Sequence, residues 1–143
     1  MHPEMGHLRL RRAEEDLFEG VCSFHGDCIE GLVSGPALAR RFDADPSSVA
    51  DGDPRWEPVA ADLAEMVGTI LLTTSAQRVL LGGGVMSDRP LLLTAVRKRV
   101  VAQLGSYLPF LTRRSALSII AAPALGINAG PLGSVALALK AVT

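Results

Sequence analysis

All of the histidines and cysteines of this chain are gathered near its start, in the order His2, His7, Cys22, His25, Cys28. The last four supply two imidazoles and two thiols and end in the pattern Cys-x2-His-x2-Cys. Four nitrogen or sulfur donors of this kind hold zinc in a tetrahedron. Gly26 and Asp27 lie between the last two donors and suit the tight turn that such close spacing requires. The spacing predicts a zinc site at His7, Cys22, His25 and Cys28.

Three alternatives compete with this prediction. His2 could replace His7 as the first ligand, Cys22 and Cys28 could form a disulfide, or both cysteines could be free thiols. A disulfide belongs to an oxidising compartment. The N-terminus has an early glutamate and a run of arginines but no apolar segment, so we expect no secretory signal there. Two unrelated free thiols would leave the clustering of every Cys and His unexplained.

Two segments carry a family resemblance. Residues 2–7 read HPEMGH and residues 20–37 read GVCSFHGDCIEGLVSGPA, and together they resemble the signature of the ROK sugar kinases. The Cys-x2-His-x2-Cys form resembles the bacterial fructokinase branch of that family. The resemblance continues through residues 81–86, LGGGVM, to the C-terminus, so it covers the whole chain.

The resemblance implies an α/β fold, namely the C-terminal lobe of an actin-like ATPase (ribonuclease H-like) fold with a zinc-binding loop. The chain would then be one domain, 1–143, with a zinc- and sugar-binding segment, 1–42, and an α/β core, 54–143. The implied reaction is transfer of a phosphoryl group from MgATP to a hexose, from D-fructose to fructose 6-phosphate. The implied complete enzyme is a cytoplasmic homodimer.

The resemblance also assigns roles to individual residues. Glu4 and Glu30 flank the predicted zinc ligands and would contact the sugar, and His7 would bind zinc through one ring nitrogen and a sugar hydroxyl through the other. Gly82, Gly83 and Gly84 match the turn that contacts the adenosine. The zinc would be structural, because four protein ligands leave no position for water. Residues 130–133, Gly-Pro-Leu-Gly, could also face the nucleotide, although a closely packed helix start is the more common use of such a sequence.

Parts of the family pattern are not present in these 143 residues. ROK kinases carry a glycine-rich phosphate loop with an aspartate, and a catalytic aspartate upstream of the Glu-x-Gly-His motif, whereas Met1 stands directly before that motif here. Phosphoryl transfer needs those groups. We therefore expect the chain alone to be an inactive C-terminal fragment. The alternative is a non-catalytic, zinc-stabilised sugar-binding or interaction module, such as a gene remnant.

Composition excludes other classes of function. The 14 basic and 15 acidic residues leave no basic surface for nucleic acid. Residues 115–139 carry no charge, but prolines and glycines interrupt them, so we expect a buried strand, a turn and a packed helix and not a membrane span. Hydrophobic residues reach 48%, which predicts that one face is covered by another lobe or chain.

The periodicity of apolar residues and the positions of glycine and proline predict the helices, strands and loops of the chain. In order, we expect an extended segment at 8–11, a solvated charge run at 12–16, a helix from 30 to 42 broken at Gly35-Pro36, and a surface loop without chemistry at 43–54. A long helix at 56–74, a buried parallel strand at 78–81, a helix from Pro90, a buried strand at 117–121 and a closing helix at 130–142 complete the chain.

Overall fold

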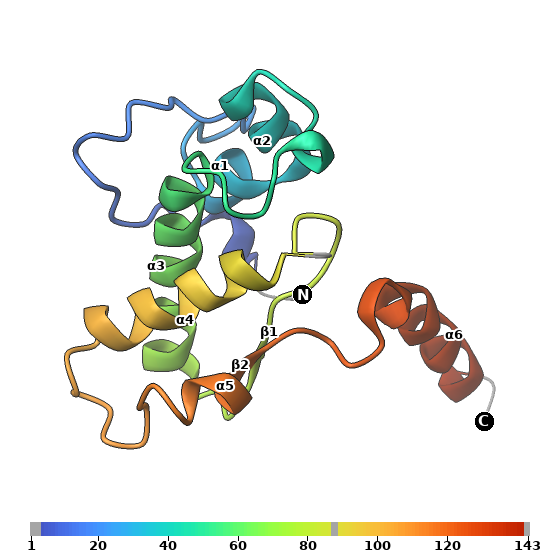
Figure 1. Ribbon diagram of the computed structural model, residues 1–143. Helices are drawn as coiled ribbons and strands as arrows, with labels where there is room; N and C mark the ends of the chain where they lie inside the picture. Colours follow the sequence, from blue (N-terminus) through green and yellow to red (C-terminus); the bar gives the residue numbers. More distant parts are fainter. Residues whose placement is uncertain (1–3, 87–88, 142–143) are drawn as a thin grey trace.

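The computed structural model describes residues 4–86 and 89–141. It is a helix-rich α/β structure with one two-stranded parallel sheet (Figure 1). Its elements in chain order are η1 (Met5–His7), α1 (Ile29–Val33), α2 (Gly35–Phe42), η2 (Pro46–Ser48), α3 (Trp56–Thr74), β1 (Val79–Leu80), α4 (Pro90–Gln103), α5 (Ala116–Ile119), β2 (Ile120–Ala121), η3 (Gly126–Asn128) and α6 (Ala129–Ala141).

Helices α3 and α4 pack on each other and form the centre of the core. Both were predicted from their apolar spacing, and both are confirmed. The apolar face of α3 contributes Val59, Leu63 and Val67, and Val96 and Val100 of α4 are fully buried against it. Side chains of this size stabilise a fold by about 1.5–3 kcal/mol each when fully buried. The packed pair is the platform that carries the rest of the chain.

The loop that precedes α3 has a structural role that the sequence did not reveal. The carboxylate of Asp51 accepts hydrogen bonds from the backbone N–H groups of Leu91, at 2.7 Å, and Leu92, at 3.2 Å. It therefore caps the first turn of α4, where backbone donors have no partner within the helix. Arg89 reaches back to donate to the carbonyl oxygen of Val49 at 2.9 Å, and its guanidinium lies over the ring of Trp56.

The helix predicted from residue 30 is broken, as expected, but the break lies one residue earlier than Gly35. Ser34 has extended backbone angles, and its hydroxyl accepts a bond from the N–H of Ala37 at 3.4 Å. Gly35 is instead the first residue of α2. Pro36 sits in the first turn of this helix, where its missing N–H costs nothing, and the lack of a Cβ on Gly35 relieves the usual clash before proline.

The predicted strands are shorter than expected. Val79 pairs with Ile120 and Leu80 with Ala121, in parallel as predicted. Residues 117–119, however, belong to helix α5 and not to a strand. Ser115 and Thr112 bond reciprocally, each side-chain oxygen accepting from the other's backbone N–H at 2.8 and 3.1 Å, and this starts a helical turn. Ile120 is buried, whereas Leu80 is exposed, so only part of the sheet is buried.

The closing helix was predicted and is present as α6, but the prediction that it is packed is wrong. No residue of α6 is buried. In Figure 1 the chain after β2 runs through an extended segment and η3 to α6, which lies apart from α3 and α4. Of the helices in the described part of the chain, none is long and apolar enough to span a bilayer.

Candidate functional site

Residues 20–31 form a tight knuckle in the backbone. Cys22 and Gly26 exchange two hydrogen bonds in an antiparallel bridge, with N···O distances of 3.1 and 2.9 Å. Asp27 donates to the carbonyl oxygen of His25 at 2.8 Å, which turns the chain a second time. Gly26 has a φ of +66°, a conformation that glycine adopts without strain. The Gly-Asp turn expected from the sequence is therefore part of the knuckle.

Two further glycines, which the sequence analysis did not single out, make the knuckle possible. A Cβ on Gly31 or on Gly20 would overlap the carbonyl oxygen of Gly26. Val21 donates to the carbonyl oxygen of Gly31 at 2.9 Å, so the start of α1 lies directly on the knuckle. The signal was a glycine just outside each end of the Cys-x2-His-x2-Cys pattern.

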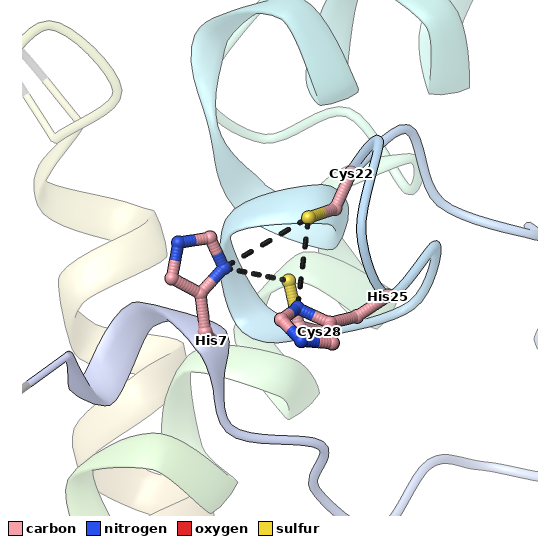
Figure 2. A group of neighbouring side chains, drawn as sticks. All are labelled: His7, Cys22, His25 and Cys28. Carbon is pink, nitrogen blue, oxygen red and sulfur yellow. Dashed lines mark hydrogen bonds between the residues drawn. The ribbon is translucent and has the colours of Figure 1, made fainter.

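The knuckle and η1 bring His7, Cys22, His25 and Cys28 together, as Figure 2 shows. One ligand atom from each of the four lies within 4.8 Å of the others. Nδ1 of His7 is 3.8 Å from Sγ of Cys22 and 3.7 Å from Sγ of Cys28, and Nδ1 of His25 is 3.8 Å from Sγ of Cys22. Donors bound to one tetrahedral zinc ion at 2.0–2.3 Å would lie roughly 3.3–3.8 Å apart. The donor set and its spacing fit such an ion.

The four side chains are held by three neighbouring pieces of backbone. His7 ends η1, Cys22 and His25 lie on the knuckle, and Cys28 is the N-cap of α1. A hydrogen bond of 3.0 Å from the N–H of Ile29 to the carbonyl oxygen of Leu8 ties the segment after His7 to the start of α1. Arg9 adds contacts of 2.8 Å to the carbonyl oxygen of His25 and 2.7 Å to the carboxylate of Asp27.

The two thiols differ in their environments. Backbone N–H groups of Phe24 and His25 point at Sγ of Cys22 and lower the pKa of its thiol to about 6. Burial raises the pKa of Cys28. Both cysteines are free, so the disulfide alternative is not what the structure contains. The exposed loop thus offers a thiolate at neutral pH, which is the form that binds a metal.

Glu30 faces the ring of His7 from the side opposite the thiols. Its Oε2 is 3.6 Å from Nε2 of His7, whereas Nδ1 points at the two sulfur atoms. One imidazole therefore joins the Cys/His cluster to an exposed carboxylate. Gly6 lies beside this carboxylate, because a Cβ there would be 3.8 Å from Oε2 of Glu30.

Glu4 is exposed and precedes η1, and its carbonyl oxygen accepts a bond of 3.0 Å from the N–H of His7. Both glutamates therefore contact His7: Glu4 with its backbone carbonyl oxygen and Glu30 with its carboxylate. His2, the alternative first ligand, lies outside the described residues.

A buried ion network supports the segment that leads into the knuckle. The prediction of a solvated charge run at 12–16 holds for Glu14 and Glu15, which are exposed, and is wrong for Arg12 and Asp16, whose side chains are only 18% and 10% exposed. The carboxylate of Asp16 accepts from Arg12 at 3.0 Å and also pairs with Arg41. Arg41 binds Asp62 of α3 at 3.0 Å, and the side chains of Arg41 and Asp62 are only 6% and 4% exposed. The network joins the loop to α2 and α3. Residue spacing alone did not reveal it, because the partners are far apart in sequence.

The glycines at 82–84 follow β1, at the edge of the sheet where the carboxyl ends of β1 and β2 meet. Gly82 and Gly83 line a hollow of about 360 Å³ together with Pro123 and Gly126. Ligands of open α/β sheets bind at this edge. A Cβ on Gly82 would lie 2.7 Å from Cγ of Pro123, which is too close for any other residue to fit without a shift. Gly83 has a φ of +83°, which also favours glycine. A Cβ on Gly84 would meet nothing within 4 Å.

None of the residues that line this hollow belongs to the Cys/His cluster. The glycines at 130 and 133 lie in α6, and no atom lies within 4 Å of a Cβ built on either. Within residues 4–86 and 89–141, nothing outside the helix itself packs closely on that helix start.

Comparison with known proteins agrees with the resemblance. The profile of the ROK family matches residues 1–141. A Bacillus subtilis (strain 168) protein named "Putative fructokinase" is 36% identical over 142 residues, which cover 99% of this chain and 47% of that protein. A Zymomonas mobilis protein named "Fructokinase" is 36% identical over 143 residues, with coverage of 98% and 46%. The chain thus spans about half the length of the relatives it matches.

Proposed function

Because the chain belongs to the ROK family, we propose that it is the sugar-binding and metal-bearing half of a fructokinase-like kinase. The complete enzyme transfers the γ-phosphoryl group of MgATP to a hexose, and we assign D-fructose as that hexose. The chain is the C-terminal lobe of an actin-like fold, with residues 1–42 for the metal and sugar and residues 54–143 as the α/β core.

One observation carries this proposal: the two ring nitrogens of His7 face two different functional groups, the thiols on one side and Glu30 on the other. A metal bound by His7, Cys22, His25 and Cys28 would fix the orientation of the imidazole. Glu30 and Glu4 then offer acceptors in fixed directions to the hydroxyls of a sugar. Carboxylates held in this way orient a small polar ligand before any chemistry occurs.

We assign zinc as the metal, in a structural role. Thiolates and imidazoles are its preferred ligands, and a set of four protein donors leaves no open position for water. Its contribution is to hold the knuckle and η1 together, since ligation of this kind adds to folding free energy. Two ionisable thiols in one cluster fit a reducing compartment, so we place the kinase in the cytoplasm.

The nucleotide belongs at the hollow beside Gly82 and Gly83. A volume of about 360 Å³ lies within the usual range for small-ligand sites, and backbone without Cβ atoms permits close approach. Gly84 belongs to the same turn. Phosphoryl transfer also requires phosphate-binding loops, a metal-positioning acid and a base. We assign those groups to the half that the relatives have beyond this chain, so the 143 residues alone are inactive.

A chimera tests the proposal. The part of the Zymomonas mobilis relative that this chain does not cover is fused before Glu4, and fructose-dependent formation of ADP from MgATP is measured. We expect turnover with fructose and little with glucose. Glu30→Gln should lower kcat/KM by at least about tenfold, since one charge-assisted hydrogen bond is worth 1.4 kcal/mol or more. The control, Glu15→Gln, changes an exposed glutamate outside the cluster. An active chimera that is insensitive to Glu30→Gln refutes the assigned sugar site.

A further inference from the structure

The Cys/His cluster brings two free thiols of one chain next to each other. Its four ligand atoms lie within 4.8 Å of one another, so Sγ of Cys22 and Sγ of Cys28 are no farther apart than that. Figure 2 shows both sulfur atoms beside the same ring nitrogen of His7. A Cβ on Gly31 would lie 2.9 Å from Cβ of Cys22, so Cys22 lies directly on the first turns of α1, which Cys28 caps. A pair held this closely needs only a small movement to be joined by a disulfide bond.

The two thiols differ in their access to solvent. Cys28 is 0% exposed, whereas Cys22 lies on the knuckle and is partly exposed. A small oxidant that arrives from solvent therefore meets Cys22 first, and Cys28 is in position to react second. Redox sensors are built in this way, from one accessible thiol and a neighbouring thiol that resolves it. We propose that Cys22 and Cys28 are a redox pair whose oxidant is hydrogen peroxide.

The oxidation takes two steps, and each step moves one electron pair from sulfur. The thiolate of Cys22 attacks one oxygen of the peroxide, the O–O bond breaks, a sulfenic acid forms on Cys22, and the departing hydroxide takes up a proton. The thiolate of Cys28 then attacks Sγ of Cys22, the S–S bond forms, the S–O bond breaks, and the second hydroxide takes up a proton. Two electrons have then passed from the thiolates to the peroxide, which leaves as two molecules of water.

A disulfide removes two of the four donors from the Cys/His cluster. The imidazoles of His7 and His25 remain, and two neutral donors hold zinc far less tightly than a closed set that includes two thiolates. Nδ1 of His7 thereby loses the partner that fixes the ring, although Nε2 still faces Glu30. Oxidation therefore frees the imidazole on which the assigned sugar site depends. This consequence for the sugar rests on the proposed function, whereas the disulfide does not.

Backbone bonds that do not involve the thiols keep the redox pair together. Cys22 and Gly26 are joined by two hydrogen bonds, and Val21 donates to the carbonyl oxygen of Gly31 at 2.9 Å. Cys22 therefore stays beside Cys28 after the metal has left, which favours a bond within the chain over a bond between chains. Reduction can rebuild the cluster for the same reason. Disulfides in the cytoplasm are mostly transient ones of this sensing kind.

Hydrogen peroxide is the probe, and the 143-residue chain loaded with zinc is the sample. A chromophoric indicator follows the release of zinc, and a thiol reagent counts the thiols. We expect about one zinc to leave for each pair of thiols lost, since one disulfide opens one four-ligand site. A dithiol reductant with added zinc should reverse both changes.

Mass spectrometry identifies the product. Trypsin cuts after Arg12 and Arg40, so both cysteines fall in the peptide 13–40, which contains no methionine. Its mass therefore reports the cysteines alone and should fall by two hydrogen atoms. Ser23→Ala, a matched control that changes an exposed residue of the same knuckle, should release zinc at the rate of the parent chain.

The order of attack is tested with Cys28→Ser. Without the second thiol, the sulfenic acid on Cys22 should persist and be trapped by dimedone, a reagent for sulfenic acids. If this variant fails to fold, the mass of the peptide 13–40 from the parent chain still decides between a disulfide and other products.

Three results would overturn the redox pair: oxidation to sulfinic or sulfonic acid without a disulfide, a disulfide between two chains, or zinc that stays bound after the disulfide has formed. A chain that holds no zinc before oxidation would refute the assigned metal and the redox pair together. An inactive chimera, alongside normal disulfide formation and zinc release in the 143-residue chain, would refute the proposed kinase and leave the redox pair standing.

Discussion

The knuckle at residues 20–31 and helix α6 are opposite cases within one short chain. The knuckle has its partners nearby, since its backbone bonds, its glycine contacts and the four Cys/His side chains all come from residues 7–34. Helix α6 has an apolar surface on all sides and no buried residue. The first region finds its contacts within its own residues, whereas the second finds almost none in the described part of the chain.

The difference separates structure that neighbouring residues can form by themselves from structure that they cannot. Cys and His side chains that are close in sequence can be gathered into one cluster without the rest of the protein, because short loops bring them together. The apolar surface of a helix cannot be buried by its neighbours in sequence, since only packing against other elements removes it from water. Stability of the isolated chain should therefore depend strongly on the knuckle and hardly at all on α6.

The largest expected effect is that of Cys28→Ser. Cys28 is fully buried at the N-cap of α1, and its Sγ faces His7. Loss of this donor should release the metal and cost about 4 kcal/mol or more, a fall in Tm of more than about 10 °C. Elemental analysis and thermal melts measure both. Ser23→Ala, an exposed change in the same knuckle, should leave about one zinc per chain and an unchanged Tm.

The first ligand is tested by two alanine variants. His7→Ala should release the metal, because Nδ1 of His7 faces both thiols, and His2→Ala should leave it bound. The opposite outcome would transfer the ligand to His2. It would also remove the imidazole link between the cluster and Glu30.

Next in size is Gly31→Ala, which tests whether the knuckle depends on close backbone contact. The added Cβ would overlap the carbonyl oxygen of Gly26, so we expect a loss of about 2–3 kcal/mol. Gly84→Ala is the matched control, because nothing lies within 4 Å of a Cβ there and its φ is not in the left-handed region, so the change should stay within about 0.5 kcal/mol. Chemical denaturation measures the free energy of unfolding of both variants. Equal stabilities would mean that the knuckle adjusts freely.

A smaller and pH-dependent effect is expected for Asp16→Asn. Although burial alone would raise the pKa of Asp16, hydrogen bonds from Arg12 and the charge of Arg41 lower it below its ordinary value of 3.8. A lowered pKa means stabilisation that is present above pH 3.8 and is lost as the pH falls through the folded-state value. The variant should be less stable by about 1–3 kcal/mol at pH 7, and the difference should shrink below about pH 4.

Asp62→Asn is the internal comparison for that prediction. Burial raises the pKa of Asp62, so its charged form is disfavoured, and any stability linked to its proton is lost as the pH rises. We therefore expect Asp62→Asn to cost less than Asp16→Asn at pH 7. Melting curves of both variants from pH 3 to 7 test the ranking. The reverse ranking would show that Asp62 is the main partner of Arg41.

The sequence was most informative where structure is local. The donor spacing located the Cys/His cluster, and apolar periodicity located α3 and α4. It failed for the Arg41 network, because Arg41 meets one partner 25 residues away and another 21 residues away, and no pattern links them. It also failed at residues 117–119, since a short apolar run fits a strand or a buried helical turn equally well. At residues 117–119 the hydrogen bonds between Thr112 and Ser115 favour the helical turn.

The smallest expected effect completes the comparison: deletion of residues 129–143 should leave the rest of the chain as stable as before. Because no residue of α6 is buried and its main packing is against η3, its removal exposes almost no core. We expect a change in unfolding free energy within about 0.5 kcal/mol, the size of ordinary surface changes. Solubility should improve, because exposed apolar surface promotes association. Thermal melts at several protein concentrations measure both. A fall in Tm of more than about 4 °C, which corresponds to roughly 1 kcal/mol for a domain of this size, would mean that α6 already packs on the body and needs no other domain to cover it.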